Sequence, residues 1–523
     1  MNESVSMPVQ AATAAIPAQR RMAPSRIWLL LVPSLSDCLF VILMWLLFMS
    51  GIGWMTLLSD GDTGMHIQTG DLILATHAAP VRDPYSFVAP DKPWYAWEWL
   101  SDIAFASVHA AAGLKGVALL SGSIICLAMV LLFRHMLWRG AGIHVATLLT
   151  VLAVGASSVH FLARPHIFTT LLAVVTMWML DHDWVNPGRR VWLLVPIAAV
   201  WANLHGGFLV LIVGLGVFAA SALLRGDRQR AYRYAGLTGA CSAATLINPY
   251  GWNLHLHIWN YMRADWLLKS IDEFLSPVFR SESMFKFEVL LFLGLAVILN
   301  LIRSGRSREA LLIAFWAHAA LTSIRHVTIY AIAVAPPVAE QIGIAWDRWT
   351  AASARASAKG ILRDLLREFQ GHATRTSIWV PVFLCVLAFS GWGGQWPTDF
   401  PKEKFPLDLF ARNERLIAGP GHENARILNA DHWGGYLIYK FGPSRHLFID
   451  GRSDYYGPQV VKDYVALRSA ASNWQELANR YKFDFALIPH DWPLAGALKR
   501  SGDWALRDQD NQGFLFERRH DLQ

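Results

Sequence analysis

The sequence is poor in charge and in the motifs of soluble enzymes. Of 523 residues only 16% are charged and four are cysteines. The cysteines stand in apolar stretches without a Cys-x-x-Cys or Cys/His spacing, so they indicate small buried side chains rather than disulfides or metal ligands. No HExxH, P-loop, GxSxG or GxGxxG motif occurs. Nucleotide-dependent transport and serine hydrolysis therefore have no support, and no nucleotide cofactor is expected.

Apolar residues dominate instead. They make up 54% of the chain, and there are 24 tryptophans, which is typical of a multi-pass membrane protein. The net charge of +7 could suggest nucleic acid as a partner. The basic residues, however, concentrate in short connections between apolar segments, where they set topology, so nucleic-acid binding is not expected.

The apolar segments predict a polytopic α-helical protein with about eleven spans. The first, 38–58, is uncharged and as a helix would cross roughly 30 Å of hydrocarbon. Residues 97–112 are amphipathic and are expected to lie along the membrane interface, anchored by Trp94, Trp97 and Trp99. The other expected spans lie near 114–133, 142–160, 166–181, 190–204, 207–224, 232–247, 286–302, 309–323, 326–345 and 376–393.

The Lys/Arg distribution predicts the orientation. Alternate connections, beginning with the one that holds Arg134 and Arg139 and ending with the basic stretch 348–375, carry most of the positive charge. If these are cytoplasmic, the N-terminus is cytoplasmic too. The loops 59–100 and 248–286 and everything after 391 then lie outside, which in a bacterial plasma membrane means the periplasm.

The sequence divides into four parts. Residues 1–26 predict a disordered cytoplasmic tail, 27–393 a transmembrane domain with the outer loop 59–100, and 394–422 a linker with Gly/Pro punctuation. Residues 423–523 predict a small periplasmic α/β domain. Within it, ARILNADHWGGYLIYKF, RHLFID, DFALIPH and GFLFERR are expected to be strands, and GPQVVKDYVALRSA and NWQELANRY helices.

The outer loop 59–100 is the stretch best suited to chemistry. Asp60 and Asp62 are two residues apart, so on an extended segment both carboxylates would point the same way, towards a metal ion or a phosphate-bearing substrate. Any one polar residue here could equally be a solvated loop side chain. The further candidates for substrate binding are expected in this loop, at the outer ends of spans, or at strand ends of the outer domain: His66, Arg82, Glu98, Arg164, His166, Asn203, His205, Arg325, His326, Asp450 and Arg452.

The alternatives for these residues remain open at this level. Arg164 could grip phosphate oxygens or anchor a helix at the interface. His205, between Asn203 and two glycines, could simply form a tight turn. Asp450 and Arg452 could hold an acceptor or only pair across a turn. His255 and His257 are not on one helical face, and ordinary loop histidines are the preferred interpretation.

An acidic first outer loop directly after the first span, many further spans and an outer C-terminal α/β domain resemble the GT-C glycosyltransferases, which use polyprenyl-phosphate-linked sugars. The DGDTGMHIQTGD and NLHGGF segments are similar to those of an uncharacterised bacterial branch near this superfamily. The segment from Asp431 to Tyr436 is similar in position to the Trp-Trp-Asp-Tyr-Gly segment of oligosaccharyltransferases. Its second Trp and motif Asp are out of register, so recognition of an Asn-X-Ser/Thr acceptor is not carried over.

The resemblance implies that Asp60 is the catalytic acidic residue and Asp62 its neighbour, and the two are the candidate ligands for Mg²⁺ or Mn²⁺. The donor would be a polyprenyl-phosphate sugar in contact with membrane lipids, and the acceptor a glycan, lipid or protein. Transfer needs a carboxylate to activate the acceptor and positive charge to stabilise the departing phosphate. Arg82, Arg164 or Arg325 could supply that charge, and the sequence does not say which.

Two other classes of function stay open. A transporter would be expected to show ionisable residues within spans and inverted repeats. The sequence shows no convincing repeat, and its charges sit at the ends of spans. A non-catalytic protein of envelope polysaccharide assembly would use the α/β domain for docking.

Overall fold

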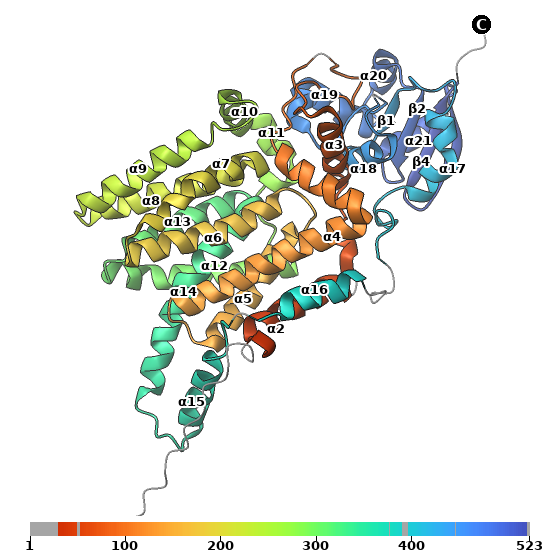
Figure 1. Cartoon of the computed structure of the whole chain (residues 1–523). Coiled ribbons are helices and arrows are strands. Elements are labelled where there is room, and N and C mark those ends of the chain that lie inside the picture. The colour runs from red at the N-terminus through yellow and green to blue at the C-terminus, as the bar shows by residue number, and fades with distance from the viewer. Residues whose placement is uncertain are drawn as a thin grey trace, which may run out of the picture.

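The chain folds into a helical bundle with an α/β body at one end (Figure 1). The computed structural model describes residues 30–49, 53–90, 92–375, 377–389, 396–444 and 446–519. The tail expected over 1–26 lies outside these residues.

A helix coincides with each of the eleven apolar segments. Within the described residues, five stretches are long and apolar enough to cross a membrane: Trp99–Trp138, Ile143–His160, Gly206–Leu224, Glu282–Arg303 and Ile324–Ala351. The protein is therefore a multi-pass membrane protein, and the count of eleven spans stays a prediction. The bundle helices are α2 (Leu35–Met49), α4 (Trp99–Trp138), α5 (Ile143–Ser157), α6 (His166–Val185), α7 (Leu194–Leu204), α8 (Leu209–Leu224), α9 (Arg228–Ala244), α12 (Glu282–Arg303), α13 (Ser307–Thr322), α14 (Val327–Ala351) and α16 (Trp379–Phe389).

The first of these helices departs from expectation. Helix α2 ends at Met49 rather than running through Leu58, and Gly53 beyond it has a positive φ of 50° that a helix does not accept. Helix α4 is broken at Gly113, whose φ of 62° and ψ of −160° are not helical, so that a helical part from Trp99 precedes the expected span. This break falls at the boundary expected from the sequence, and the interfacial position of the first part stays a prediction.

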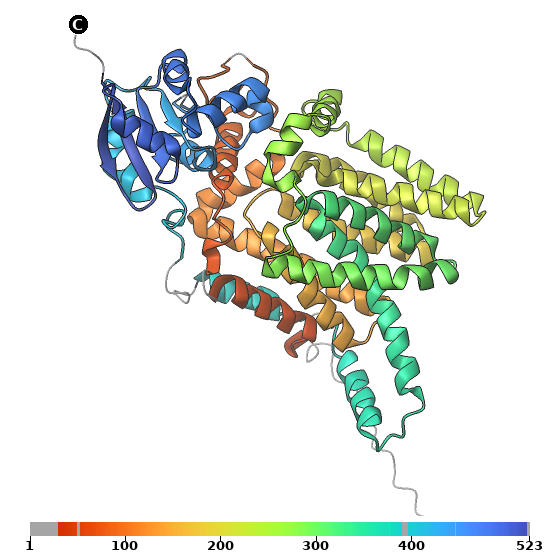
Figure 2. The same ribbon diagram turned by 180° about the vertical axis from the view of Figure 1, so that it is seen from behind.

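Two helical pairs lie along the outside of the bundle, and only the second of them extends away from the α/β body (Figure 1). Helices α2 and α16 lie side by side in both views, although more than 300 residues separate them (Figures 1 and 2). Helix α14 contains Pro336 and Pro337, and its final turns pack beside α15 (Ala358–Gln370). Helix α15 exposes Ile361, Leu365 and Phe369 alongside basic residues, which is typical of a helix at a lipid surface.

The α/β body has a four-stranded sheet in the order β1-β2-β4-β3. Strand β1 (Ile427–Asn429) is parallel to β2 (Phe485–Pro489), whereas β3 (Trp504–Gln509) and β4 (Gly513–Arg518) are antiparallel. Helices α17 (Leu407–Ala418), α18 (Asp431–Phe441), α19 (Ser453–Arg468), α20 (Trp474–Tyr481) and α21 (Pro493–Arg500) surround it.

Several expectations for this body were wrong in detail. The long strand expected from Ala425 is only β1, after which Asp431 begins α18. Residues 433–438 are all buried, and an unbroken buried run does not distinguish a strand from a helix. The RHLFID segment is not a strand; Leu447 makes isolated bridges to Ser86 and Ile427. The expected linker contains α17, and β3 was missed. The helices at 453–468 and 474–481 and strands β2 and β4 are confirmed.

The first loop belongs with the α/β body rather than standing alone in water. Its helix α3 (Asp62–Thr76) crosses α18 at contacts that only glycine permits. A Cβ on Gly64 would lie 2.6 Å from the Gly435 carbonyl oxygen, and one on Gly435 would lie 2.3 Å from that of Gly61. Gly61 and Gly64 of the DGDTGMHIQTGD segment and Gly435 of the segment from Asp431 to Tyr436 therefore allow close packing of the two helices.

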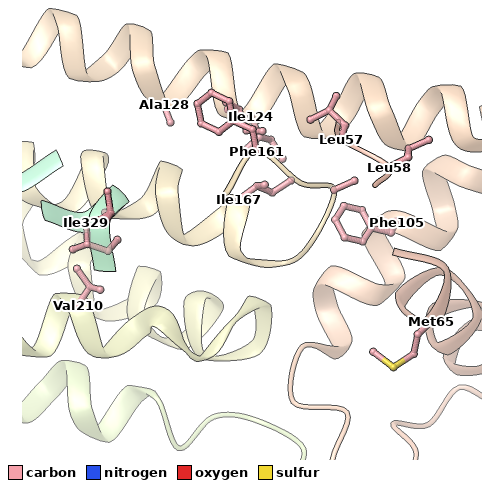
Figure 3. Close-up of a cluster of buried hydrophobic side chains, with 14 of the residues drawn as sticks. Leu57, Leu58, Met65, Phe105, Ile124, Ala128, Phe161, Ile167, Val210 and Ile329 are labelled. Atoms are coloured by element: carbon pink, nitrogen blue, oxygen red, sulfur yellow. The ribbon is translucent and has the colours of Figure 1, made fainter. Parts of the chain in front are cut away.

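A buried apolar cluster supports the region where this loop meets the bundle (Figure 3). Leu57 and Leu58 from the segment before α3, Phe105 from α4, and Phe161 and Ile167 around the start of α6 are all almost fully buried. The two segments that carry Asp60 and Arg164 are thus anchored in one core.

Candidate active site

The backbone around Asp60 is clamped to the backbone around Arg164. The Ala163 N–H donates to the Leu57 carbonyl over 2.7 Å, and the Thr63 hydroxyl donates to the Ala163 carbonyl over 2.9 Å. These bonds join chain segments about one hundred residues apart. They fix the Arg164 side chain against the start of α3.

Arg164 lies at the centre of three carboxylates. Its Nη1 is 2.9 Å from Asp60 Oδ2 and 3.1 Å from Glu273 Oε1, and its Nη2 is 3.1 Å from Asp62 Oδ2. The Asp62 N–H donates to Asp60 Oδ1 over 2.9 Å. The expectation of an extended Asp60–Asp62 segment was wrong, because Asp62 is the first residue of α3; both carboxylates nevertheless reach the same guanidinium.

Glu273 comes from the loop 248–286, which folds into α10 (Trp252–Met262), α11 (Asp265–Ser270) and η5 (Asp272–Phe274). The Ser323 hydroxyl donates to the Glu273 carbonyl oxygen over 2.8 Å, which ties η5 to the turn before α14. On that turn Arg325 Nη2 lies 3.7 Å from Glu273 Oε2, and the guanidinium stacks on Phe274. Arg325 is therefore held more loosely than Arg164.

The carboxylates of the cluster differ in pKa. Arg164 lowers the pKa of Glu273 to about 2, although burial opposes the shift. Burial raises the pKa of Asp62 to about 6, and the neighbouring Asp60 charge adds to the rise. A carboxyl group that titrates near neutral pH suits general acid–base chemistry.

A second polar chain runs beside this cluster. Asp102 Oδ1 lies 2.7 Å from His66 Nδ1, His66 Nε2 is 3.8 Å from Glu98 Oε2, and Glu98 Oε1 is 3.4 Å from His205 Nε2. The four side chains come from α3, α4 and the segments that precede α4 and α8. They form a row of titratable groups in which Asp102 and His66 are hydrogen-bonded, whereas His66 and Glu98 are too far apart for a direct hydrogen bond.

The hydrogen bonds define the tautomer of His205. Its Nδ1 accepts from the Gly207 N–H over 2.9 Å and faces the Thr169 hydroxyl at 2.8 Å, while that hydroxyl oxygen accepts from Trp201 Nε1. The proton of the neutral ring is therefore on Nε2, facing Glu98. Burial holds the pKa of His205 well below its usual value, and burial raises the pKa of Glu98 to about 7.

A cavity of about 330 Å³ opens between these groups. Its volume is in the range of small-ligand sites. Val210 and Ile329, labelled in Figure 3, form part of its apolar wall. Asp60 and Asp62 are not among the lining residues but contact Arg164, which is one of them. The polar residues that line the cavity are Glu98, His160, Arg164, His166, Thr169, Thr170, His205, Asp272, Glu273, Arg325 and Thr328.

Some of the candidate residues lie elsewhere. Arg82 is exposed and does not line the cavity. Asn203 accepts from Trp99 Nε1 and donates to the Ala199 and Ile247 carbonyls, so its amide is used in packing. His326 likewise contacts the Ala319 carbonyl oxygen.

Histidines near the site have separate partners. His166 Nε2 donates to the His160 carbonyl oxygen over 2.6 Å. His255 and His257 lie on helix α10 rather than on extended backbone, and His257 pairs with Asp454 while His255 faces Thr245. Among the described residues, no group of three or more His, Cys, Asp and Glu side chains is arranged to hold a metal ion.

The Asp450–Arg452 turn of the α/β body reaches the site through its glycine. Arg452 is buried and pairs with Asp450 at 2.6 Å and Asp83 at 2.8 Å. A Cβ on Gly451, by contrast, would lie 2.5 Å from Asp62 Oδ1. The turn thus packs directly against the Asp62 carboxylate.

The sequence predicted that many of these residues lie at one end of the bundle, but several residues of the site were not among its candidates: Asp102, His160, Thr169, Thr170, Asp272, Glu273 and Thr328. Glu273 stood out only as an acidic residue in an expected outer loop, next to Asp272. Asp102 and Thr169 lie inside apolar helical patterns, and neither gives a signal before the fold brings His66 and His205 to them.

The fold and the site together define a class. The chain is a multi-pass membrane protein in which a polar site lies where the helical bundle meets an α/β body.

Solved structures with a similar fold include three of an archaeal enzyme. The chain is similar to the oligosaccharyltransferase of Archaeoglobus fulgidus in its apo form, with a TM-score of 0.58 and 12% identity over 89% of this chain and 70% of that one. For the same protein tethered to an acceptor peptide that contains the NVT sequon, the TM-score is 0.60 and the identity 12%, over 95% of this chain and 74% of that one. For its complex with an inhibitory peptide and a dolichol-phosphate, named AglB, the TM-score is 0.59 and the identity 13%, over 95% of this chain and 74% of that one. At these identities the likeness shows the fold.

No protein-family model matches the sequence, and no curated protein matches it either. The assignment of a function therefore rests on the geometry of the site and on the fold.

Proposed function

We propose that this protein is an integral membrane glycosyltransferase that transfers a sugar from a polyprenyl-phosphate donor to a glycan, lipid or protein acceptor on the outer face of a bacterial plasma membrane. The observation that carries the proposal is the carboxylate cluster on Arg164 beside a cavity that also contains Arg325. Transfer from a lipid phosphate requires both elements, a carboxylate for the acceptor and a cation for the departing phosphate.

Arg325 is the arginine we assign to the donor phosphate. It lines the cavity, its side chain is 31% exposed, and its ion pair with Glu273 is 3.7 Å long. It also hydrogen-bonds Tyr261 and stacks on Phe274. Arg164 has its guanidinium among three carboxylates, and Arg82 is outside the cavity. A partly exposed guanidinium near the membrane with a long ion pair offers a planar, bidentate grip on phosphate oxygens.

Asp60 and Asp62 act on the acceptor in this proposal. Both contact Arg164, and Asp62 lies next to the Gly451 turn of the α/β body. Donor and acceptor would then meet at Arg164, and Asp62, with its pKa raised to about 6, would take the acceptor proton. The structures of the similar archaeal enzyme with a peptide and with dolichol-phosphate support a lipid-phosphate donor.

Substitution of the carboxylates tests the proposal. We expect Asp60→Asn to abolish detectable transfer and Asp62→Asn to do so nearly as severely, because loss of a catalytic acid or base costs about 10² to 10⁴-fold in rate. Asp71→Asn, on the same helix but outside the cavity, is the matched control and should keep activity. Mass spectrometry of lipid-linked sugars and envelope glycans, with and without the protein, identifies the donor first.

The same experiment separates this proposal from a scaffold in polysaccharide assembly. A scaffold would support assembly equally well with Asp60→Asn and Asp62→Asn at matched expression. Wild-type glycans in both variants would therefore remove the transferase site as placed here. A matched pair of arginine variants adds to this: Arg325→Gln should lower transfer about 10 to 150-fold, from the roughly 1.5–3 kcal/mol of a charged hydrogen bond, and Arg82→Gln should leave it unchanged.

A further inference from the structure

The carboxylates of the site can be tested for their fit to a divalent cation. Mg²⁺ or Mn²⁺ would need oxygen ligands at roughly 2.0–2.2 Å around one point. Here Asp60, Asp62 and Glu273 each direct an oxygen towards one point, but that point holds the Arg164 guanidinium, with N···O distances of 2.9 to 3.1 Å. The three residues therefore do not fit a metal while Arg164 keeps its place.

Arg164 has no easy way to leave. Arginine cannot lose its charge in a protein, so it cannot be neutralised to admit a cation. The backbone beside it is held by the bonds from Ala163 to Leu57 and from Thr63 to Ala163. A divalent ion would also have to sit within a few ångströms of a fixed positive charge.

We propose that Arg164 is the permanent cation of this site, in the position where a divalent metal would otherwise gather the carboxylates, and that transfer by this protein requires no divalent metal. The inference rests on the proposed function for its catalytic part. Its structural part, that the wild-type carboxylate cluster does not bind a metal, stands on the geometry alone.

Arg164 then has two roles. It draws Asp60 from the segment before α3, Asp62 from α3 itself and Glu273 from the loop before α12 into one cluster, against their mutual repulsion. It also lines the cavity with a side chain that is 26% exposed, so that its charge faces the donor beside that of Arg325. A fixed cation of this kind is preorganised and needs no loading.

The binding test uses the purified full-length protein in detergent and Mn²⁺, followed by the electron paramagnetic resonance signal of the free ion. We expect wild-type protein to leave that signal unchanged at micromolar Mn²⁺. Arg164→Gln removes the charge and leaves the three carboxylates, so it should take up about one Mn²⁺ per chain, and the double variant Arg164→Gln with Asp62→Asn should lose this uptake.

The activity test compares transfer in EDTA with transfer in added Mn²⁺. We expect wild-type rates within about twofold of each other, and a loss of about 10² to 10³-fold in Arg164→Gln, as for removal of one stabilising group from a transition state. Arg82→Gln is the matched arginine control and should keep the wild-type rate in both conditions.

Either of two results overturns the inference. One is uptake of one Mn²⁺ per wild-type chain that Asp60→Asn abolishes; the other is wild-type transfer that stops in EDTA and returns with Mn²⁺. If no sugar transfer is found with any donor, the proposed function fails, while the Mn²⁺ titration of wild type and Arg164→Gln still decides whether Arg164 takes the place of a metal.

Discussion

Arg452 allows a quantitative test of how the α/β body is held together. Its side chain is only 8% exposed, and its guanidinium donates to both Asp450 oxygens and to Asp83 Oδ1 over 2.6 to 2.8 Å. It also lies 4.7 Å from the centre of the Trp94 ring. Asp83 belongs to the first loop and Asp450 to the α/β body, so one arginine joins the two.

Arg452→Ala should destabilise this region strongly. The substitution leaves two buried carboxylates without their cation, and breaking a buried pair by removal of one partner costs about 3–5 kcal/mol. At roughly 2–4 °C per kcal/mol for a body of 150–250 residues, the unfolding midpoint should fall by about 6–20 °C. Thermal unfolding followed by near-UV circular dichroism measures it.

Arg507→Ala is the matched control. Arg507 pairs with Glu517 across β3 and β4, but its side chain is 51% exposed, and such pairs contribute about 0–1 kcal/mol. The unfolding midpoint of the Arg507→Ala variant should fall by less than about 4 °C. Equal midpoints for the two variants would refute the structural role of Arg452. Loss of transfer at an unchanged midpoint would instead favour the role in holding an acceptor.

Three further predictions concern the site and its orientation. Gly451→Ala should lower transfer at least tenfold without a large loss of stability, because its Cβ would lie 2.5 Å from the Asp62 carboxylate; wild-type kinetics would show that the turn does not cover Asp62. The pKa of Asp62, about 6, predicts that kcat/KM falls as pH drops below about 6, since the carboxylate must be ionised to accept a proton. A pH profile that is flat from pH 5 to 7 would exclude Asp62 as the base. Reporter fusions should place Asp60 and the body after Asp431 on the same, outer side of the membrane, and a cytoplasmic reporter at either would contradict the topology.

The sequence alone predicted where the helices of the bundle lie and at which end of the bundle the polar candidate residues gather. An uncharged run of apolar residues has to satisfy its own backbone hydrogen bonds in lipid, so every such segment became a helix. Polar residues at the ends of those segments are for the same reason gathered at the membrane surfaces. Arg164, His205 and Arg325 could thus be placed near Asp60 before the structure was known.

Which charged side chains form ion pairs was decided only by the tertiary structure. Arg164 and Asp60 are 104 residues apart, and Glu273 lies a further 109 beyond Arg164, so no local pattern predicts that they meet. The same is true of Asp83 and Arg452, which are separated by 369 residues. Hydrophobic periodicity specifies which face of a helix is buried. Which buried or half-buried charges neutralise one another depends on how distant segments pack, and that packing made Arg164 the centre of the carboxylates and left Arg325 facing the cavity.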